Sequence, residues 1–290
     1  MKFLRILFFL IVTITANSSA GSLLLPKAKL ALYADTDTII RKRSISVGLN
    51  FGSDAMFFGR TGPIRYPFYS ADVVYNTKQG FFVYGSLLRL IGYRTSIDEI
   101  DVGGGYLYRP SKKFSGSISY TRFIFNKEQR IIESATNNDI NFKNAYDWGP
   151  FKSTVILDYL FGRSNDFFVT ISQSKHFEPN WRLLSNNDYI TFNPTISMIL
   201  GTQNFVQTYS VDHQDHLLPS VSNKSGYSPY LFNNGRFNAL NYSFKLPIAY
   251  NRPHYTLEFA YKYSIPVNVE GTLRNRRESF YNVTFYYLFY

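Results

Sequence analysis

The chain has 290 residues, no cysteine and a formal net charge of +11. Without cysteine it is not a secreted scaffold held together by disulfides. Aromatic residues make up 18% of the chain although its mean hydropathy is only −0.17. The sequence has a positive net charge but contains no basic helix and no base-stacking motif, so we expect no nucleic-acid partner.

The N-terminus predicts export. Lys2 and Arg5 precede an apolar run over residues 6–14, and small and polar residues follow up to Ala20. This is the pattern of a secretory signal peptide, and the run is too short to cross about 30 Å of hydrocarbon as a helix. We therefore expect a signal peptide over residues 1–20, cleaved after Ala20. No cysteine follows the cleavage site, so a lipid-anchored lipoprotein is excluded.

Beyond the signal peptide, we interpret residues 21–43 as an N-terminal periplasmic segment without a clear strand. From residue 44 onward, apolar and polar residues alternate in short runs, which is the period of a half-buried strand. The predicted strands are 44–51, 68–76, 81–90, 98–108, 114–125, 151–161, 167–175, 189–200, 205–211, 237–246, 254–266 and 278–290.

The connections between these strands alternate in length. The turn at residues 77–80 is short, whereas residues 126–150 and 212–235 form long polar segments. Short periplasmic turns, longer outer loops and strands that meet lipid with every second residue are typical of outer-membrane barrels. We therefore expect an all-β fold over residues 44–290: a transmembrane, antiparallel, up-and-down β-barrel of about twelve strands. We place residues 177–187 among the longer, outer connections.

A proline and a run of three glycines inside the predicted strands indicate local departures from regular strand structure. Pro194 interrupts a strand of otherwise strict alternation and removes one ladder hydrogen bond, so we expect a bulge there. Gly103, Gly104 and Gly105 lack the helix and the Lys-Ser/Thr pair of a phosphate-binding loop. Glycines in a barrel strand instead permit bending or make room for a bulky neighbour.

The last strand ends the sequence without a polar tail. One of its faces presents an apolar and aromatic series: Tyr281, Val283, Phe285, Tyr287 and Phe289. This ending resembles the C-terminal strand of bacterial outer-membrane β-barrels, although here the series stops one residue before the final Tyr290. The resemblance implies a location in the bacterial outer membrane and a porin-like architecture without naming a particular family. It also implies contact with outer-membrane lipid and lipopolysaccharide, and recognition of the C-terminal strand by the barrel-assembly machinery.

The other face of the strands predicts the candidate site, because polar residues at alternate positions point into the lumen of a barrel. The charged residues on this face lie among Ser, Thr and Asn, and we expect them to line a pore: Asp72, Glu99, Asp101, Asp158, Lys245, Glu258 and Lys262. A twelve-stranded barrel lies between the filled interior of roughly 8 strands and the open channel of 16. These charges therefore fit either a narrow aqueous path or a plug of ion pairs.

Three functions fit these residues. The polar lumen favours a narrow channel for small polar solutes. An outer-membrane hydrolase would use His213 and His216 with Asp212 and Asp215, and we interpret that segment as a polar loop. The third possibility is a non-conducting surface or scaffold barrel. Neither His176 nor His254 stands in a His-x-Ser pair, and no Gly-x-Ser-x-Gly occurs. We assign no catalytic residue, no metal ligand and no cofactor.

Overall fold

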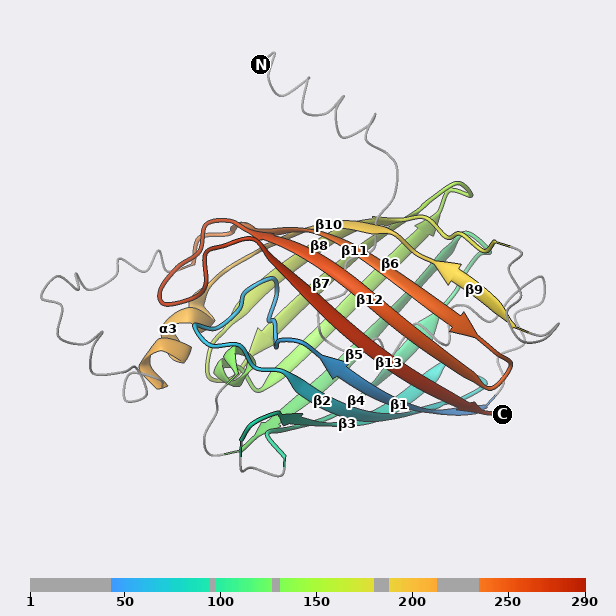
Figure 1. The fold of residues 1–290 in the computed structure, drawn as a ribbon, viewed down its shortest axis with the longest axis horizontal. Coiled ribbons are helices and arrows are strands. Elements are labelled where there is room, and N and C mark those ends of the chain that lie inside the picture. Colours follow the sequence, from blue (N-terminus) through green and yellow to red (C-terminus); the bar gives the residue numbers. More distant parts are fainter. Residues whose placement is uncertain (1–42, 94–96, 127–130, 180–187, 213–234) are drawn as a thin grey trace, which may run out of the picture.

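The computed structural model describes residues 43–93, 97–126, 131–179, 188–212 and 235–290 (Figure 1). These residues form a closed antiparallel barrel of twelve strands, one of them split into two segments. The elements are β1 (Ser44–Gly52), β2 (Phe68–Asn76), β3 (Phe81–Leu90), β4 (Glu99–Tyr108), β5 (Phe114–Phe125), η2 (Ile132–Ala135), β6 (Asn138–Asp147), β7 (Lys152–Phe161), β8 (Asp166–Ser174), β9 (Tyr189–Phe192), β10 (Thr195–Gly201), α3 (Asn204–Asp212), β11 (Asn238–Asn251), β12 (Tyr255–Pro266) and β13 (Glu278–Phe289).

The barrel closes through its first and last strands. β1 pairs with β2 on one side and with β13 on the other, and Ile45 lies opposite Phe289. The start of β1 therefore lies at the same end of the barrel as the C-terminus. We call this end, on the right in Figure 1, the C-terminal end, and the opposite end, which carries α3, the helix end.

β9 and β10 form one barrel strand that is interrupted at Asn193 and Pro194. Both segments pair with β11, while only β10 pairs with β8. The bulge predicted at Pro194 is absent, because the pair Phe192 and Ile248 and the pair Thr195 and Lys245 are three residues apart on both strands. The strand is interrupted there instead, since proline offers no N–H to the ladder. The hydroxyl of Thr195 donates to the Asn193 carbonyl at 2.8 Å, across the interruption.

The two faces of the wall differ as the alternation predicts. On β13 the series from Tyr281 to Phe289 points outward, and Val283 is 41% exposed. On β10, Ile196 is 44% exposed while its neighbour Thr195 is 1% exposed. An apolar outer surface has no favourable contact with water, so this belt fits a hydrocarbon surrounding.

Two sequence predictions are wrong, and their errors cancel in the strand count. Residues 138–147, assigned to a long loop, form β6. Residues 205–211, assigned to a strand, belong to α3. In α3 the apolar Phe205, Val206 and Tyr209 are all buried, and their spacing is that of one helix face rather than of alternation. The carboxylate of Asp166 accepts the backbone N–H groups of Asn204 (2.7 Å) and Phe205 (2.9 Å), which favours the start of a helix.

The missed strand changes which connections share an end. Residues 162–165 form a short turn at the helix end, and residues 175–188 connect β8 to β9 at the C-terminal end. The grouping of residues 177–187 with the other long connections at one end is therefore wrong, as far as the described part up to residue 179 shows. The other connections follow the predicted alternation. The longer connections 53–67, 126–137 and 267–277 lie at the helix end, and the short turns 77–80, 109–113 and 148–151 lie at the C-terminal end.

The glycines of β4 make room for aromatic rings inside the barrel. A Cβ at Gly103 would lie 2.5 Å from the ring of Tyr84, and one at Gly105 would lie 2.8 Å from the ring of Phe82. The two rings belong to β3 and lie across β4, and the Tyr84 hydroxyl hydrogen-bonds with that of Thr121 on β5. Of the two roles considered for these glycines, the structure shows space for a bulky neighbour.

The predicted signal peptide and nearly all of the segment 21–43 lie outside the described residues. Among the described residues, no helix is long and apolar enough to cross a membrane.

Candidate functional site: the lumen and its mouth

The structure places the seven residues predicted to line the lumen on the inward faces of five strands. Asp72 lies on β2, Glu99 and Asp101 on β4, Asp158 on β7, Lys245 on β11, and Glu258 and Lys262 on β12. The side chains of Asp72, Glu99, Asp101 and Asp158 are at most 6% exposed. They therefore lie within a lumen that side chains largely fill at these levels.

Acidic residues gather on the wall formed by β4, β6 and β7. Asp139 on β6 joins Glu99, Asp101 and Asp158, and it lies near enough to Asp158 and to Glu133 of η2 to interact with their charges. Asn141 donates its amide to the Asp158 carboxylate. Within the described residues, one carboxylate oxygen each of Asp139 and Asp158 is buried without a hydrogen-bond donor.

The lumenal lysines lie on β11 and β12. Lys245 forms an ion pair with Glu258 at 3.8 Å, and Lys262 stands directly beside Lys245 in the strand register. The ammonium of Lys262 also contacts the sulfur of Met56 at 3.2 Å. The structure thus brings three predicted residues together here: Lys245, Glu258 and Lys262.

The acidic residues and the lysines lie on different parts of the wall. In the circuit of twelve strands, Lys262 on β12 lies five strands from β4 and β6 and four from β7, whereas β11 lies only three strands from β7. Both groups contain charges of both signs, because Lys143 of β6 lies near enough to Asp158 to interact with its charge and Glu258 pairs with Lys245. Low-dielectric walls concentrate the field of such charges in the lumen. Asp72 lies apart from both groups, on β2 against Gly48 of β1.

The helix end of this lumen is closed by a plug that consists of residues 53–67, η2 and α3. The tip of the 53–67 loop turns at Phe58 and Gly59, both with positive φ (43° and 78°). Phe57 and Phe58 pack into a buried apolar cluster with Phe168, Phe205 and other residues of the wall and of α3. A Cβ at Gly59 would lie 2.3 Å from Asn241 of β11, so the tip approaches the wall closely.

Arg60 ties the tip of the plug loop to the wall around β11 and the end of β12. Its side chain is 0% exposed. The guanidinium donates to Gln203 (2.9 and 2.8 Å) and to the backbone carbonyls of Leu240 (2.7 Å), Val267 (2.7 Å) and Asn268 (3.1 Å). Burial lowers the pKa of Arg60 to about 10, with the charge of Glu270 opposing the shift. The group therefore stays charged at neutral pH.

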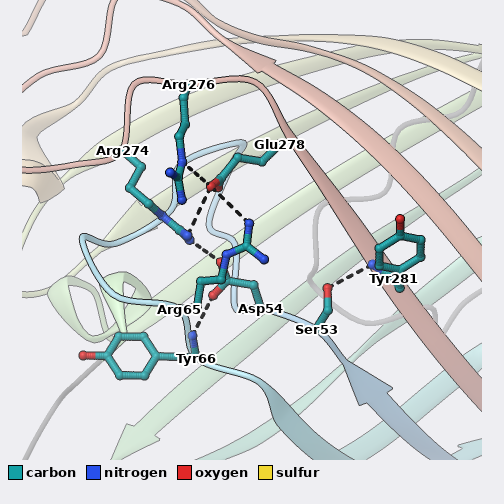
Figure 2. Close-up of polar contacts among 8 residues, drawn as sticks. All are labelled: Ser53, Asp54, Arg65, Tyr66, Arg274, Arg276, Glu278 and Tyr281. Atoms are coloured by element: carbon teal, nitrogen blue, oxygen red, sulfur yellow. Dashed lines mark hydrogen bonds and ion pairs between the residues drawn. The ribbon is translucent and has the colours of Figure 1, made fainter.

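A second set of contacts fastens the base of the same loop to β13 (Figure 2). Asp54 accepts the Tyr66 N–H at 2.7 Å and forms an ion pair with Arg274. Glu278 at the start of β13 accepts hydrogen bonds from three arginines: Arg65 (3.4 Å), Arg274 (3.3 Å) and Arg276 (2.7 Å). Ser53 exchanges two 2.9 Å hydrogen bonds with the backbone of Tyr281. We call Asp54, Arg274 and Glu278 the latch.

Sequence reasoning missed the residues of the plug and part of the acidic wall. Asp139 was missed because residues 138–147 were assigned to a loop, although Ile140 and Phe142 alternate with Asp139 and Asn141. Arg60 and the latch lie in connections, where the strand period carries no information. The run Phe57-Phe58-Gly59-Arg60 in a loop was the available signal, because exposed aromatics in a loop seek burial.

The two histidines that the structure describes, His176 and His254, both lie at the C-terminal end of the barrel. His213 and His216 lie outside the described residues. His176 contacts Asn193 (2.8 Å) and Glu178 (3.4 Å) at the C-terminal end, and His254 lies against the Tyr287 ring. No described cluster of three or more His, Asp or Glu side chains suits a metal ion.

A closed barrel with an apolar outer belt and a polar, charged lumen defines this chain as an outer-membrane type of β-barrel protein, with a porin-like architecture. No model of a known protein family matches the sequence, and no curated protein matches it.

Among solved structures, the chain is similar to a KdgM porin, with 10% identity over 84% of this chain and 99% of the other and a TM-score of 0.47. A NanC porin gives 9% identity over 83% and 98% of the two chains, with a TM-score of 0.47. LpxR from Salmonella typhimurium gives 8% identity over 84% and 100%, with a TM-score of 0.42. At such identities and scores the activities of these proteins imply nothing about this chain.

Proposed function

We propose that this protein is a narrow, gated channel for small polar solutes in the bacterial outer membrane. The observation that carries the proposal is the polar and charged lumen, which holds Asp139 and Asp158 on β6 and β7 and Lys262 on β12. A barrel that only needed a filled interior would gain more from apolar packing, because burying charges costs several kcal/mol per ion. Acceptors such as the Asp139 and Asp158 oxygens are satisfied by water in an aqueous path.

The plug supports a gated rather than a permanently open channel. The loop of residues 53–67 is held to Leu240 and Val267 through Arg60 and is fastened at its base by the latch. Its contacts are a mixture of apolar packing and charge-assisted hydrogen bonds from a single loop. A loop can exchange such contacts for water without breaking any strand pairing, so the barrel wall stays intact when the mouth opens.

Planar-bilayer recordings test this proposal. The wild type should give rare conductance steps, and the double variant Phe58→Ala, Arg60→Ala should open far more often because the plug loses its anchor and its main ring contact. Arg89→Ala is the matched control, because Arg89 is an exposed arginine on the outer face of β3 near the same end. If the wild type and the double variant are both folded by circular dichroism and both silent, the channel proposal fails.

The filled lumen favours one alternative, a non-conducting barrel that serves as a surface or scaffold protein. Phe123, Leu160 and Phe168 are at most 1% exposed and occupy the interior near the helix end. The same recordings separate the two functions. The proposed contacts with lipopolysaccharide and with the barrel-assembly machinery apply to both.

A further inference from the structure

An apolar cavity lies on the outer surface of the barrel beside the break in the split strand. It has a volume of about 500 Å³ and opens outward. Its lining residues are Phe177, Glu178, Pro179, Phe192, Pro194 and Leu246. The hollow lies beside Asn193 and Pro194, where the split strand is interrupted.

The cavity faces the surroundings of the barrel rather than its lumen. Phe192 and Pro194 belong to the outward series that Ile196 continues, and Leu246 follows Phe244 in the outward series of β11. On a barrel that crosses a membrane, an apolar hollow on this face is open to acyl chains and closed to the lumenal water.

The cavity lies toward the C-terminal end of the barrel. The segment after β8 pairs with β9 through Phe177 and Phe192, with two 2.9 Å hydrogen bonds, at the C-terminal end. Exposed aromatic residues gather at this end, among them Trp148 and Tyr189. Such aromatic belts mark the boundary between hydrocarbon and headgroups.

Two charged side chains of opposite sign border the cavity. Lys175 lies directly beside Pro194, and its ammonium sits 4.8 Å from the centre of the Phe177 ring. Glu178 lines the cavity itself, and its side chain is 53% exposed. An ammonium and a carboxylate on one apolar hollow match a headgroup that carries both a phosphate and a protonated amine.

We propose that this cavity binds a zwitterionic phospholipid with a primary amine in its headgroup. One acyl chain lies against Phe192, Pro194 and Leu246, the phosphate meets Lys175, and the headgroup ammonium meets Glu178. The lipid belongs to the leaflet at the C-terminal end. This site does not depend on whether the barrel conducts.

Native mass spectrometry of the purified full chain tests the proposal, with phosphatidylethanolamine, phosphatidylglycerol or phosphatidylcholine added in turn. One phosphatidylethanolamine should stay bound at activation energies that strip the other two. Lys175→Gln should weaken its retention by about tenfold, the loss expected for one charge-assisted contact. Leu246→Trp should abolish retention of any lipid by filling the cavity. Glu178→Gln should remove the preference for phosphatidylethanolamine over phosphatidylglycerol.

Lys78→Gln is the matched control, because Lys78 lies exposed in the turn at residues 77–80 of the same end and away from the cavity. Circular dichroism and heat-shifted mobility on gels establish that each variant is folded. Equal retention of phosphatidylethanolamine by the wild type, Lys175→Gln and Leu246→Trp overturns the proposal. Displacement of the bound phospholipid by purified lipid A assigns the site to the other leaflet and overturns it as well.

Discussion

Phe58 at the tip of the plug loop stacks on Phe168 of β8, with ring centroids 3.8 Å apart and ring planes within 5° of parallel. The two residues are far apart in the sequence, and the contact joins a loop to the wall of the barrel. Both side chains are at most 1% exposed. The stack therefore couples the position of the loop to the barrel interior.

Replacing the ring at the loop tip should weaken the plug. Phe58→Ala removes the stack and leaves a cavity, and Phe→Ala changes in cores cost about 3–5 kcal/mol. Because the wall strands keep their hydrogen bonds, we expect the loss to appear as easier opening of the loop. Limited proteolysis in detergent should cleave within residues 53–67 faster in this variant. Phe81→Ala, at an exposed ring on the outer wall, is the control. Equal cleavage in the two variants would contradict the assigned role.

The architecture could be predicted from the sequence because a barrel strand has to alternate apolar and polar residues. Each strand of the barrel separates lipid from lumen, so every second residue is apolar, and the terminal strand shows this over its whole length. The strand over residues 138–147 was missed because its outward face contains Asn144 as well as Ile140 and Phe142. The helix at α3 was mistaken for a strand because Phe205 and Tyr209 fit both periods in so short a segment.

The plug could not be predicted from the alternation of apolar and polar residues. Arg60 is buried by contacts with Gln203, Leu240 and Val267, all of them distant in the sequence. Local pattern carries no information on which wall residues will face a loop. The lumenal charges were found because they lie on strands, whereas the latch residue Asp54 and its partner Arg274 both lie in connections.

Labelling of intact cells should distinguish the corrected topology from one read from loop length alone. We propose that the helix end faces outward. An introduced cysteine at Asn165, in the short turn of residues 162–165, should then react with a membrane-impermeant maleimide, and one at Gln79 should not. The chain has no cysteine of its own to interfere. Reaction at Gln79 alone would reverse the orientation of the barrel.

Adjacent residues of β13 offer a test of the register. Val283 points outward and is 41% exposed, while Asn282 points inward. Val283→Arg places a charge on the lipid face, where arginine near the midplane costs about 2–4 kcal/mol. Asn282→Arg places the same charge in the polar lumen. Urea unfolding in lipid vesicles should show a larger loss of unfolding free energy for Val283→Arg than for Asn282→Arg. The difference should be at least half of the cost of about 2–4 kcal/mol. Equal losses would mean that the faces are exchanged.

The contribution of Asp54 to the stability of the latch should change with pH, in a direction set by the burial of its carboxyl group. Burial raises the pKa of Asp54 above its usual 3.8, although the Tyr66 N–H and Arg274 oppose the shift. A carboxyl with a raised pKa in the folded state contributes its stability fully below the unfolded pKa and loses it as pH rises through the folded pKa.

Asp54→Asn tests this sign, because the amide keeps the shape and cannot ionise. The unfolding free energy of the wild type minus that of Asp54→Asn should fall as the pH rises from about 3 to 7. At neutral pH, Asp54→Ala should be worse than Asp54→Asn by about 1–3 kcal/mol, because the Tyr66 N–H is left without its acceptor. If the unfolding free energy of the wild type minus that of Asp54→Asn rises with pH instead, the ion pair with Arg274 outweighs the effect of burial on the pKa of Asp54.

The lumenal charges should set the ion preference of the channel that we propose. Because charges of both signs line the lumen, removing one sign leaves the other to attract its counter-ions. In the background of Phe58→Ala and Arg60→Ala, Lys262→Glu should shift the reversal potential in a KCl gradient toward cation preference, and Asp158→Asn should shift it toward anion preference. Lys113→Glu, in an exposed turn at the C-terminal end, is the control for net charge. If Lys113→Glu shifts the potential as far as Lys262→Glu does, the charges inside the barrel do not line the path of the ions.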